Sequence, residues 1–552
     1  MDRYPLPTPW GPEQAKSLSL SLRESKKNHI WDIVIVGAGI TGAGIARDAA
    51  MRGLQTLVID QGDVASGTSS RSSRLVHGGV RYLEHGDFSL VHEALRERSV
   101  LYKIAPHLVR PERFRFLSYR GDRLGILRLR AGLTLYDALN LFRGDGHQYL
   151  SPKTILQQEP SIAESELLGA IEYEDALTDD TRLTLATLQS ARRYGAEVLT
   201  YNMVQRVYCD PQSQLHCLEL EENTKIRAHQ VVCALGPWST QALLGDVARN
   251  VLMTSKGIHL VFLAKHLPVR KPMVIQASDR QRILFAIPWG NRTYVGTTDD
   301  HFEGNPGHAQ IEREDILGLL EELTRVFPQA NVNTSHIVGA WVGIRPLVRK
   351  SNSKHNTSRI SRNHRILERD DGILAILGGK LTTYRSMAEE ILERTRPRLS
   401  RFRPELVRSW PRSKTKDCPL VENLNDTDEI EEPYSALRSN LYQRHGLFAD
   451  SLVEQIKRQP VLAEPIFSDL PYRWIEVHHA IYYEGARHLD DIVRRRIPIN
   501  LLGPSHPMPI VQKIATELVQ AWGGTPSDIN EELERYHTML ELERPDCIAP
   551  AD

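Results

Sequence analysis

The chain of 552 residues is too long for one hydrophobic core, so we expect two to four domains. Its 69 basic and 69 acidic residues cancel, which gives no broad electrostatic reason to expect nucleic acid as a partner. The five cysteines lack CxxC spacing, which argues against a zinc site, a redox pair or a disulfide framework; we expect no metal and a reducing compartment.

Residues 1–30 are polar and charged, and we expect an N-terminal extension that is either flexible or bound to the protein surface. The extension lacks the apolar segment of a secretory signal. No stretch of the chain reaches the roughly 18 uninterrupted apolar residues of a membrane helix. These patterns predict a cytoplasmic protein whose membrane contact, if there is one, is peripheral.

Residues 32–60 predict a β-α-β unit that holds a dinucleotide. The apolar run Ile33–Val36 is a buried strand. Three glycines follow it at GxGxxG spacing: Gly37, Gly39 and Gly42. They allow a tight turn, a close approach of backbone to a pyrophosphate, and close packing of the helix through Ala43–Arg52 on the strand. The second strand is predicted over Thr56–Ile59 and ends in Asp60. The carboxylate of Asp60 would accept hydrogen bonds from ribose hydroxyls and favour FAD or NAD over NADP.

A hydroxyl-rich loop follows this unit and suits hydrogen bonding to a pyrophosphate and to the polar side of a flavin. Its hydroxyl-bearing residues are Thr68, Ser69, Ser70, Ser72 and Ser73. The next residues, His77, Gly78 and Gly79, would let the backbone lie close to a ring system. An ordinary polar loop and a structural histidine are the alternatives.

Two later segments are expected to return to the nucleotide unit, because folds of this type interleave two domains. The first is a helix over 181–194 with strands that lead to Gln230–Leu235. The second is the apolar strand Gly372–Leu377, which runs into a helix from Thr382 to Arg394. Between them, alternating segments such as His259–Leu263 predict a β-rich substrate domain.

The second return contains a candidate site for negative charge. Its residues are Gly378, Gly379, Lys380, Leu381, Thr382 and Thr383. Free backbone N–H groups at the helix start can stabilise negative charge on a flavin, and Lys380 adds a second cation. A solvated helix cap is the alternative.

The predicted fold class is α/β: a Rossmann-like FAD-binding domain interleaved with a β-rich substrate domain, followed by an all-α C-terminal domain. The predicted boundaries are 31–400 for the oxidoreductase part, with FAD-binding segments near 31–110, 180–240 and 370–400 and a substrate domain near 241–369; 401–432 for a linker; and 433–552 for the helical domain. The acidic run Glu422–Glu432 fits the linker and equally a solvated surface loop.

A series of short motifs runs along the chain in a fixed order. They are GTSSRSSRLVHGGVRYL at Gly67–Leu83, APHLVRP at Ala105–Pro111, GPW at Gly236–Trp238, IPWG at Ile287–Gly290, VGTTD at Val295–Asp299, GIRPL at Gly343–Leu347, GGKLTTYR at Gly378–Arg385 and LDDIVRRR at Leu489–Arg496. Together they closely resemble the FAD-dependent glycerol-3-phosphate dehydrogenase family. The chain departs from the family pattern at Leu235, where Thr is more usual, at Arg74, where Lys is more usual, and over 120–158.

The resemblance implies oxidation of sn-glycerol 3-phosphate to dihydroxyacetone phosphate, with hydride transfer from C2 to FAD and electrons passed to a quinone-type acceptor. It also implies peripheral contact with the cytoplasmic face of the inner membrane, and it allows a homodimer. Arg494, Arg495 and Arg496, with Ile492 and Val493, would either assist at the membrane or pack as ordinary helix and surface residues.

The resemblance also assigns residues to roles. Catalytic roles go to His259, Arg345 and Lys380; substrate binding goes to Arg81, Tyr82, Arg345, Arg362 and Lys380; cofactor binding goes to Gly37, Gly39, Gly42, Asp60, Thr68, Ser69, Ser70, His77, Gly78, Gly79, Val204, Gly236, Gly379, Lys380, Leu381, Thr382 and Thr383. Arginine suits a phosphate because its planar fork binds oxyanions bidentately. A histidine with an ordinary pKa near 6.5 suits removal of the C2 hydroxyl proton. Arg345, or a water that it polarises, is the alternative base.

Three other functions are alternatives to this dehydrogenase activity. An FAD-dependent amino-acid or amine oxidase would share the architecture and use an arginine for a carboxylate. A glycerol-3-phosphate oxidase would pass electrons to oxygen. A flavin-binding scaffold would have lost catalysis, and the presence of Arg81, His259, Arg345 and Lys380 argues against it. Lys380 together with several arginines favours phosphate over carboxylate.

Overall fold

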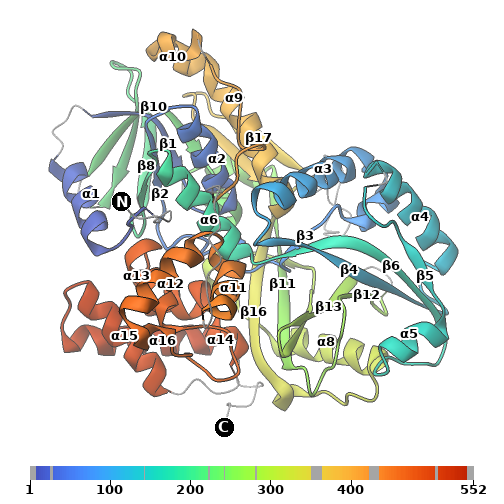
Figure 1. The fold of residues 1–552 in the computed structure, drawn as a ribbon. Coiled ribbons are helices and arrows are strands. Elements are labelled where there is room, and N and C mark those ends of the chain that lie inside the picture. Colours follow the sequence, from blue (N-terminus) through green and yellow to red (C-terminus); the bar gives the residue numbers. More distant parts are fainter. Residues whose placement is uncertain are drawn as a thin grey trace.

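The computed structural model describes residues 8–24, 29–141, 143–221, 224–241, 243–279, 282–349, 363–408, 410–421, 434–503 and 508–543. Within these residues the chain forms two β-sheets and a group of C-terminal helices (Figure 1). The predicted α/β class with an all-α C-terminal part is therefore confirmed.

The first sheet is built on parallel strands in the order β18-β10-β1-β2-β7. Their bounds are β1 (Ile30–Val36), β2 (Thr56–Ile59), β7 (Glu197–Leu199), β10 (Lys225–Cys233) and β18 (Leu374–Gly378). Antiparallel strands extend it: β17 (His364–Glu368) pairs with β18, and the hairpin of β8 (Val204–Cys209) and β9 (His216–Leu220) pairs with β10. Since β10 and β18 return to β1 from far along the chain, the predicted interleaving is confirmed.

Both faces of β1 are buried, which explains its continuous apolar sequence. Ile33 and Ile35 pack under α2 (Ile40–Met51), α6 (Asp180–Arg193) and α9 (Tyr384–Phe402), whereas Val34 and Val36 pack on the opposite face. Gly42 lies in α2 where it passes the turn after β1. A Cβ at this position would collide with the carbonyl oxygen of Gly37, so glycine allows the helix to lie against the strand.

The second sheet has the order β15-β11-β14-β13-β12-β4-β6-β3, with β16 paired to β11 and β5 paired to β6. Its strands are β3 (Leu75–Val76), β4 (Val109–Tyr119), β5 (Gln148–Leu150), β6 (Leu167–Thr178), β11 (Leu252–Leu263), β12 (Met273–Gln276), β13 (Ile283–Trp289), β14 (Arg292–Gly296), β15 (Asp300–Phe302) and β16 (Ile337–Val348). Helices α3 (Phe88–Ile104) and α4 (Ile126–Leu139) cover one face, and α5 (Pro152–Gln158) and α8 (Arg313–Val326) cover the other.

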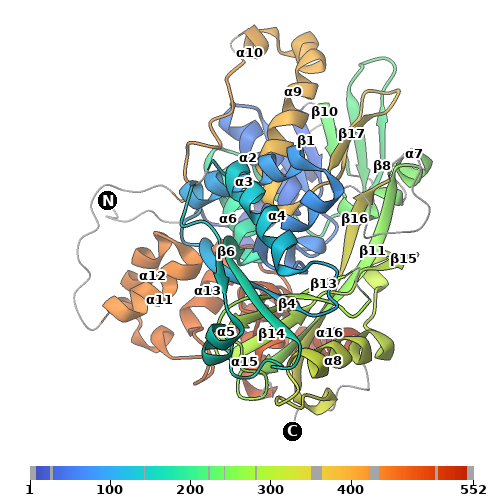
Figure 2. The same cartoon turned by 90° about the vertical axis from the view of Figure 1, so that its right-hand side faces the viewer.

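The C-terminal helices lie beneath the first sheet and beside β16, in orange and red in Figure 1. They are α11 (Ser435–His445), α12 (Phe448–Arg458), α13 (Trp474–Tyr483), α14 (Ile499–Leu502), α15 (Met508–Ala521) and α16 (Pro526–Glu543), with the π-helical turn η10 (Asp491–Arg496) between α13 and α14. Figure 2 shows α9 and α10 (Pro404–Arg408) extending from the first sheet away from them.

The basic segment of η10 is buried inside this arrangement. Ile492, Val493 and the three arginines Arg494–Arg496 are all buried. The membrane role considered for these residues is therefore wrong, and the alternative of ordinary packing is confirmed.

The acidic run Glu422–Glu432 lies outside the described residues. No helix in the described part of the chain is both long and apolar enough to cross a membrane.

The N-terminal segment packs against the C-terminal helices. Trp10 is buried, its N–H donates to the carbonyl of Tyr482 at 3.0 Å, and its carbonyl accepts from the N–H of Gly485 at 2.7 Å. α1 (Pro12–Glu24) follows directly. Over residues 8–24 the extension is thus bound to the protein surface.

Candidate active site

A cavity of about 1040 Å³ lies at the carboxyl ends of the parallel strands, where α/β sheets bind their ligands. The ends of β1 and β2 contribute Gly37 and Asp60 to its wall, and the end of β18 contributes Gly378. From the second sheet, β11 and β16 contribute His259 and Arg345. The cavity has the size expected for a large ligand such as a dinucleotide. We call it the cofactor cavity.

Most of the residues predicted from the sequence line this cavity. They are Gly37, Gly39, Asp60, Thr68, Ser69, His77, Gly79, Tyr82, Val204, Gly236, His259, Arg345, Gly379, Lys380, Leu381 and Thr382. Four predicted cofactor residues do not line the cavity: Gly42, Ser70, Gly78 and Thr383. The Ser70 hydroxyl donates to the carbonyl of Gly67, the Gly78 N–H donates to the Tyr136 hydroxyl, and the Thr383 hydroxyl donates to the sulfur of Met387. Arg362 lies outside the described residues, and of Arg81 only the backbone is described.

The turn between β1 and α2 forms one end of the cavity. α2 begins at Ile40 without a side-chain cap, and the Ile40 N–H donates to the hydroxyl of Ser69 at 2.9 Å. The Thr68 hydroxyl donates to the carbonyl of Ile344 at 2.6 Å and so ties the hydroxyl-rich loop to β16. A helix N-terminus, a glycine turn and a serine hydroxyl meet here, which is a suitable cradle for a pyrophosphate.

Asp60 marks the ribose end of this cradle. Its Oδ2 accepts from the N–H of Ala38 at 2.6 Å and its Oδ1 from the N–H of Gly62 at 2.8 Å. Burial raises the pKa of Asp60 to about 6, although the two N–H donors favour the charged form. The carboxylate is thus held in a fixed orientation on the cavity wall.

Arg345 is held on the cavity wall by the loop after β14. One terminal nitrogen donates to Thr297 Oγ1 at 2.6 Å, and the other donates to the Thr298 carbonyl at 3.2 Å and lies 3.6 Å from the carboxylate of Asp299. A Cβ at Gly257 would collide with both terminal nitrogens, so this glycine leaves room for the guanidinium. These positioning residues were not predicted from the sequence, although VGTTD contains three of them, Thr297, Thr298 and Asp299.

His259 lies on the cavity wall near Arg345 and is 1% exposed. Its Nε2 lies 2.9 Å from the hydroxyl of Ser73, and its ring stacks on Trp341 with centroids 4.6 Å apart and planes at 9°. Burial, followed by the charges of Arg345 and Arg74, lowers the pKa of His259 well below 6.5. The pKa of His259 thus departs from the ordinary histidine value, and the imidazole is neutral at neutral pH.

Lys380 and His77 lie on neighbouring parts of the wall. The ammonium of Lys380 is 3.8 Å from the centroid of the Tyr82 ring, a cation–π contact. The N–H of His77 donates to Thr382 Oγ1 at 3.1 Å, which joins the segment after β3 to the start of α9. The cavity thus brings together the β1, β3 and β18 termini, which lie far apart in the sequence.

A separate group of possible metal ligands occurs in the C-terminal helices. His445, His479 and Glu484 are buried with ligand atoms within 4.8 Å of one another. The guanidinium of Arg182 already binds the carboxylate of Glu484, and its charge opposes a cation there. We assign no metal to this group.

Two protein-family models match the chain. The family model for FAD dependent oxidoreductases matches residues 32–385, and the model for the C-terminal domain of alpha-glycerophosphate oxidase matches residues 420–527. An aerobic glycerol-3-phosphate dehydrogenase from Staphylococcus haemolyticus (strain JCSC1435) is 35% identical over 407 residues, which is 72% of each chain.

Solved structures share the fold. The glycerol-3-phosphate dehydrogenase from Bacillus halodurans complexed with FAD has a TM-score of 0.74 at 24% identity, covering 98% of this chain and 99% of that one. A glycine oxidase from Geobacillus kaustophilus has a TM-score of 0.50 at 20% identity, covering 68% of this chain and 95% of that one. The fold by itself is therefore common to enzymes with different substrates.

The protein is an FAD-dependent oxidoreductase, since the matching family model spans more than half of the chain, and FAD is its cofactor. Within that class it belongs to the glycerol-3-phosphate dehydrogenase family, as the motifs predicted. The cofactor cavity fits FAD: its glycine turn, helix N-terminus and Asp60 carboxylate supply the groups that a dinucleotide needs.

The affinity of the apoprotein for FAD is expected to fall as the pH drops through about 6. Ribose hydroxyls that donate to Asp60 stabilise its charged form, so the pKa of Asp60 is lower with FAD bound than in the apoprotein, where it is about 6. Below that pH, binding must release a proton and weakens. Quenching of flavin fluorescence by apoprotein between pH 5 and 8 measures this. Asp60→Asn should bind weakly at pH 8 and show no such decline; native affinity that is constant down to pH 5 would contradict the prediction.

Proposed function

We propose that the protein oxidises sn-glycerol 3-phosphate to dihydroxyacetone phosphate, with hydride transfer from C2 to FAD, and passes the electrons to a quinone-type acceptor. One observation carries the proposal: Arg345, Lys380 and His259 all line the cofactor cavity. Two cations and a neutral imidazole are the groups that a phosphorylated secondary alcohol needs for binding and deprotonation.

Arg345 and Lys380 would bind the phosphate. The fork of Arg345 is oriented by Thr297 and the Thr298 carbonyl, so it loses little freedom when it binds an oxyanion. Lys380 contributes a point charge from the end of β18. Bound FAD supplies the hydride acceptor.

His259 would take the proton from the C2 hydroxyl. Its low pKa keeps the ring in the form that can accept a proton. When Nε2 donates to Ser73, Nδ1 carries the lone pair, and Nδ1 has no hydrogen-bond partner among the described residues. Arg345, or a water that it polarises, is the alternative base.

The charge of the site favours this substrate over an amino acid. A phosphate dianion carries up to two negative charges and can use both cations, whereas a carboxylate carries one. An amino-acid or amine oxidase would leave the second cation uncompensated. The match to the alpha-glycerophosphate oxidase C-terminal domain supports the same choice.

The surface around α4 supports a membrane-bound acceptor. Leu127 and Leu141 are 81% and 64% exposed, and Leu135 is exposed as well. Arg128 and Arg130 are exposed between them and suit anionic lipid headgroups. Since Arg128 and Leu135 also line the cofactor cavity, α4 connects this surface with the cavity. We place the peripheral contact with the cytoplasmic face of the membrane here.

Anaerobic reduction of the flavin tests the substrate. The holoenzyme is mixed without oxygen with glycerol 3-phosphate, and separately with glycerol and with amino acids, while the visible flavin absorbance is recorded. Bleaching by glycerol 3-phosphate alone is the expected result. Bleaching by an amino acid, or none by glycerol 3-phosphate, would reject the assignment. Reoxidation of the reduced enzyme by a quinone analogue and by oxygen then separates a dehydrogenase from an oxidase.

Vesicle binding tests the α4 surface. Native holoenzyme should sediment with vesicles that contain anionic lipid, and Leu127→Glu should reduce the bound fraction about tenfold. Leu317→Glu is a matched control, because Leu317 is an exposed leucine on α8. Equal binding of native protein and Leu127→Glu would place the membrane contact elsewhere.

A further inference from the structure

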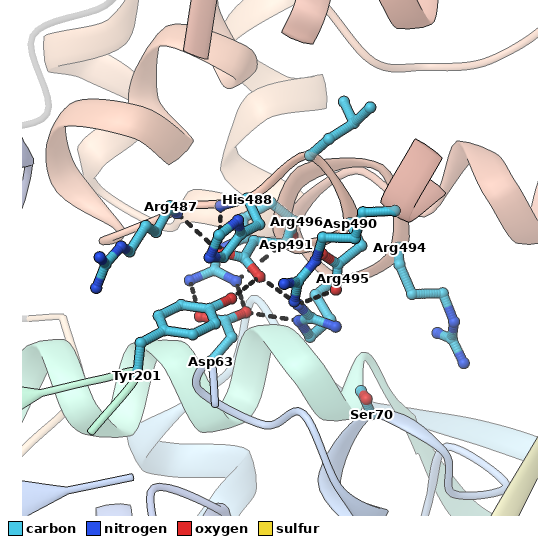
Figure 3. Close-up of polar contacts among 12 residues, drawn as sticks. Asp63, Ser70, Tyr201, Arg487, His488, Asp490, Asp491, Arg494, Arg495 and Arg496 are labelled. Carbon is cyan, nitrogen blue, oxygen red and sulfur yellow. Dashed lines mark hydrogen bonds and ion pairs between the residues drawn. The ribbon is translucent and has the colours of Figure 1, made fainter. Parts of the chain in front are cut away.

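The C-terminal helices contact the turn that carries the ribose-binding residue. Asp63 follows Asp60 by three residues, and its carboxylate is completely buried. Arg496 binds both of its oxygens, with Nη2 to Oδ1 at 2.8 Å, and Arg495 Nε donates to Oδ2 at 2.5 Å (Figure 3). Two guanidinium groups from η10 therefore share one carboxylate beside the cofactor cavity.

Both arginines are themselves held in place. Arg495 also binds Asp490 and Asp491 (Figure 3). Arg496 donates to the carbonyl of Glu484 at 2.7 Å. Tyr201, which follows β7, donates its hydroxyl to Asp491. The network thus joins η10 to the first sheet, and the π-helical turn presents two successive arginines to one acceptor.

A second contact lies at the other end of the same loop. The guanidinium of Arg71 is 3.3 Å from the carboxylate of Glu543 at the end of α16. Glu543 is fixed by Arg494 Nε at 2.8 Å and by the side-chain amide of Asn500 at 3.1 Å. The C-terminal domain therefore holds residues 60–71, which we call the cofactor loop, near both ends.

The part of the cofactor loop between these two contacts forms the cavity wall. Ser66, Gly67, Thr68 and Ser69 line the cavity. Few backbone hydrogen bonds fix this part: the N–H of Ala65 donates to the Ala38 carbonyl, and turn bonds close within the loop. Side-chain contacts therefore set its position: Ser69 accepts from the Ile40 N–H, and Thr68 and Arg71 donate to carbonyls of β16. The contacts of Asp63 and Arg71 with the C-terminal domain add to these.

We propose that the C-terminal helical domain is part of the cofactor site, with Arg495, Arg496 and Glu543 as positioning residues that hold the cofactor loop in the conformation that binds FAD. Removing one partner leaves the remaining buried charges uncompensated, and the loop moves to relieve them. A loop that must be reordered on binding lowers affinity. The inference depends on FAD occupying the cavity and not on the proposed substrate or acceptor.

The test uses near-isosteric variants of the full-length protein. Asp63→Asn weakens the contact with Arg495 and Arg496, and Glu543→Gln weakens the contact with Arg71. Asp450→Asn is the matched control, because it breaks the Arg438–Asp450 ion pair between α11 and α12 in the same domain. For each variant, the dissociation constant of FAD and the thermal midpoints of apoprotein and holoprotein are measured.

We expect both loop variants to bind FAD about 10- to 100-fold more weakly than native protein, with holoprotein midpoints lowered more than apoprotein midpoints. The control should lower both midpoints equally and leave FAD affinity within twofold. Native-like affinity in Glu543→Gln would overturn the inference, as would equal losses in control and loop variants. If Asp63→Asn does not fold, Glu543→Gln decides alone. A protein that binds FAD tightly but is not reduced by glycerol 3-phosphate would refute the proposed function and leave this inference intact.

Discussion

Arg345→Gln is expected to lower kcat/KM for glycerol 3-phosphate by about 100- to 1,000-fold while the protein keeps its FAD. A charge-assisted hydrogen bond contributes about 1.5–3 kcal/mol, and the guanidinium fork can make two of them to one phosphate. Steady-state kinetics with a soluble acceptor measure the loss, and the flavin spectrum measures cofactor content. FAD content and the thermal midpoint of the holoprotein should change little, because Arg345 is assigned to the substrate phosphate.

A second variant displaces the guanidinium of Arg345 without removing it. Gly257→Ala places a Cβ against both terminal nitrogens of Arg345, which must move away from Thr297. We expect KM to rise about tenfold with kcat nearly unchanged, because binding is weakened more than chemistry. Arg325→Gln is the control for both variants, because Arg325 lies on α8 and does not line the cofactor cavity. Its kinetic constants should stay close to the native values. If Arg345→Gln loses FAD or thermal stability together with its activity, Arg345 supports the fold and not the phosphate.

The nucleotide unit could be predicted from the sequence because its signals are local. Strand β2 was predicted as Thr56–Ile59, which is its observed extent, and Gly42 was assigned to helix packing. Parallel strands buried on both faces read as continuous apolar runs, so β1 and β18 were recognised as well. The order of the motifs then placed most of the cavity wall.

The contacts that position these residues could not be predicted in the same way. Asp63 and Arg495 are separated by 432 positions, and no local pattern links them. The same holds for Gly257 and Arg345, which meet only through pairing of β11 and β16. The predicted substrate domain, near 241–369, left out residues 109–178. These residues supply β4, β5 and β6 of the second sheet. Contacts between distant parts of the chain decide these features, and no short segment of the sequence predicts such contacts.

The charge state of His259 shows the same limit at the level of chemistry. The sequence supplies only the unperturbed histidine pKa near 6.5. In the fold, the ring is enclosed by Trp341 and lies near Arg345 and Arg74, so its pKa falls well below that value. Environment sets the pKa, and environment is a property of the fold.

Replacing His259 by asparagine is expected to slow anaerobic flavin reduction by about 100- to 10,000-fold, the usual contribution of a positioned general base. Stopped-flow mixing of the FAD-loaded variant with saturating glycerol 3-phosphate measures the rate constant directly. Asparagine keeps a polar group beside Ser73, so the cavity should be retained; FAD content and substrate affinity within a few fold of native check this. A rate within tenfold of native would instead favour Arg345, or a water that it polarises, as the base.

The pH dependence of the native enzyme provides an independent check on His259. A base works only when deprotonated, and burial lowers the pKa of His259 well below 6.5, so its active form is present throughout the neutral range. After correction for the substrate phosphate, which titrates near pH 6, kcat/KM should therefore be constant from pH 8 to 6.5 and decline only at distinctly lower pH. An acid limb centred at or above pH 6.5 would mean that a group other than His259 is responsible for it. Loss of the acid limb in the asparagine variant would assign it to this ring.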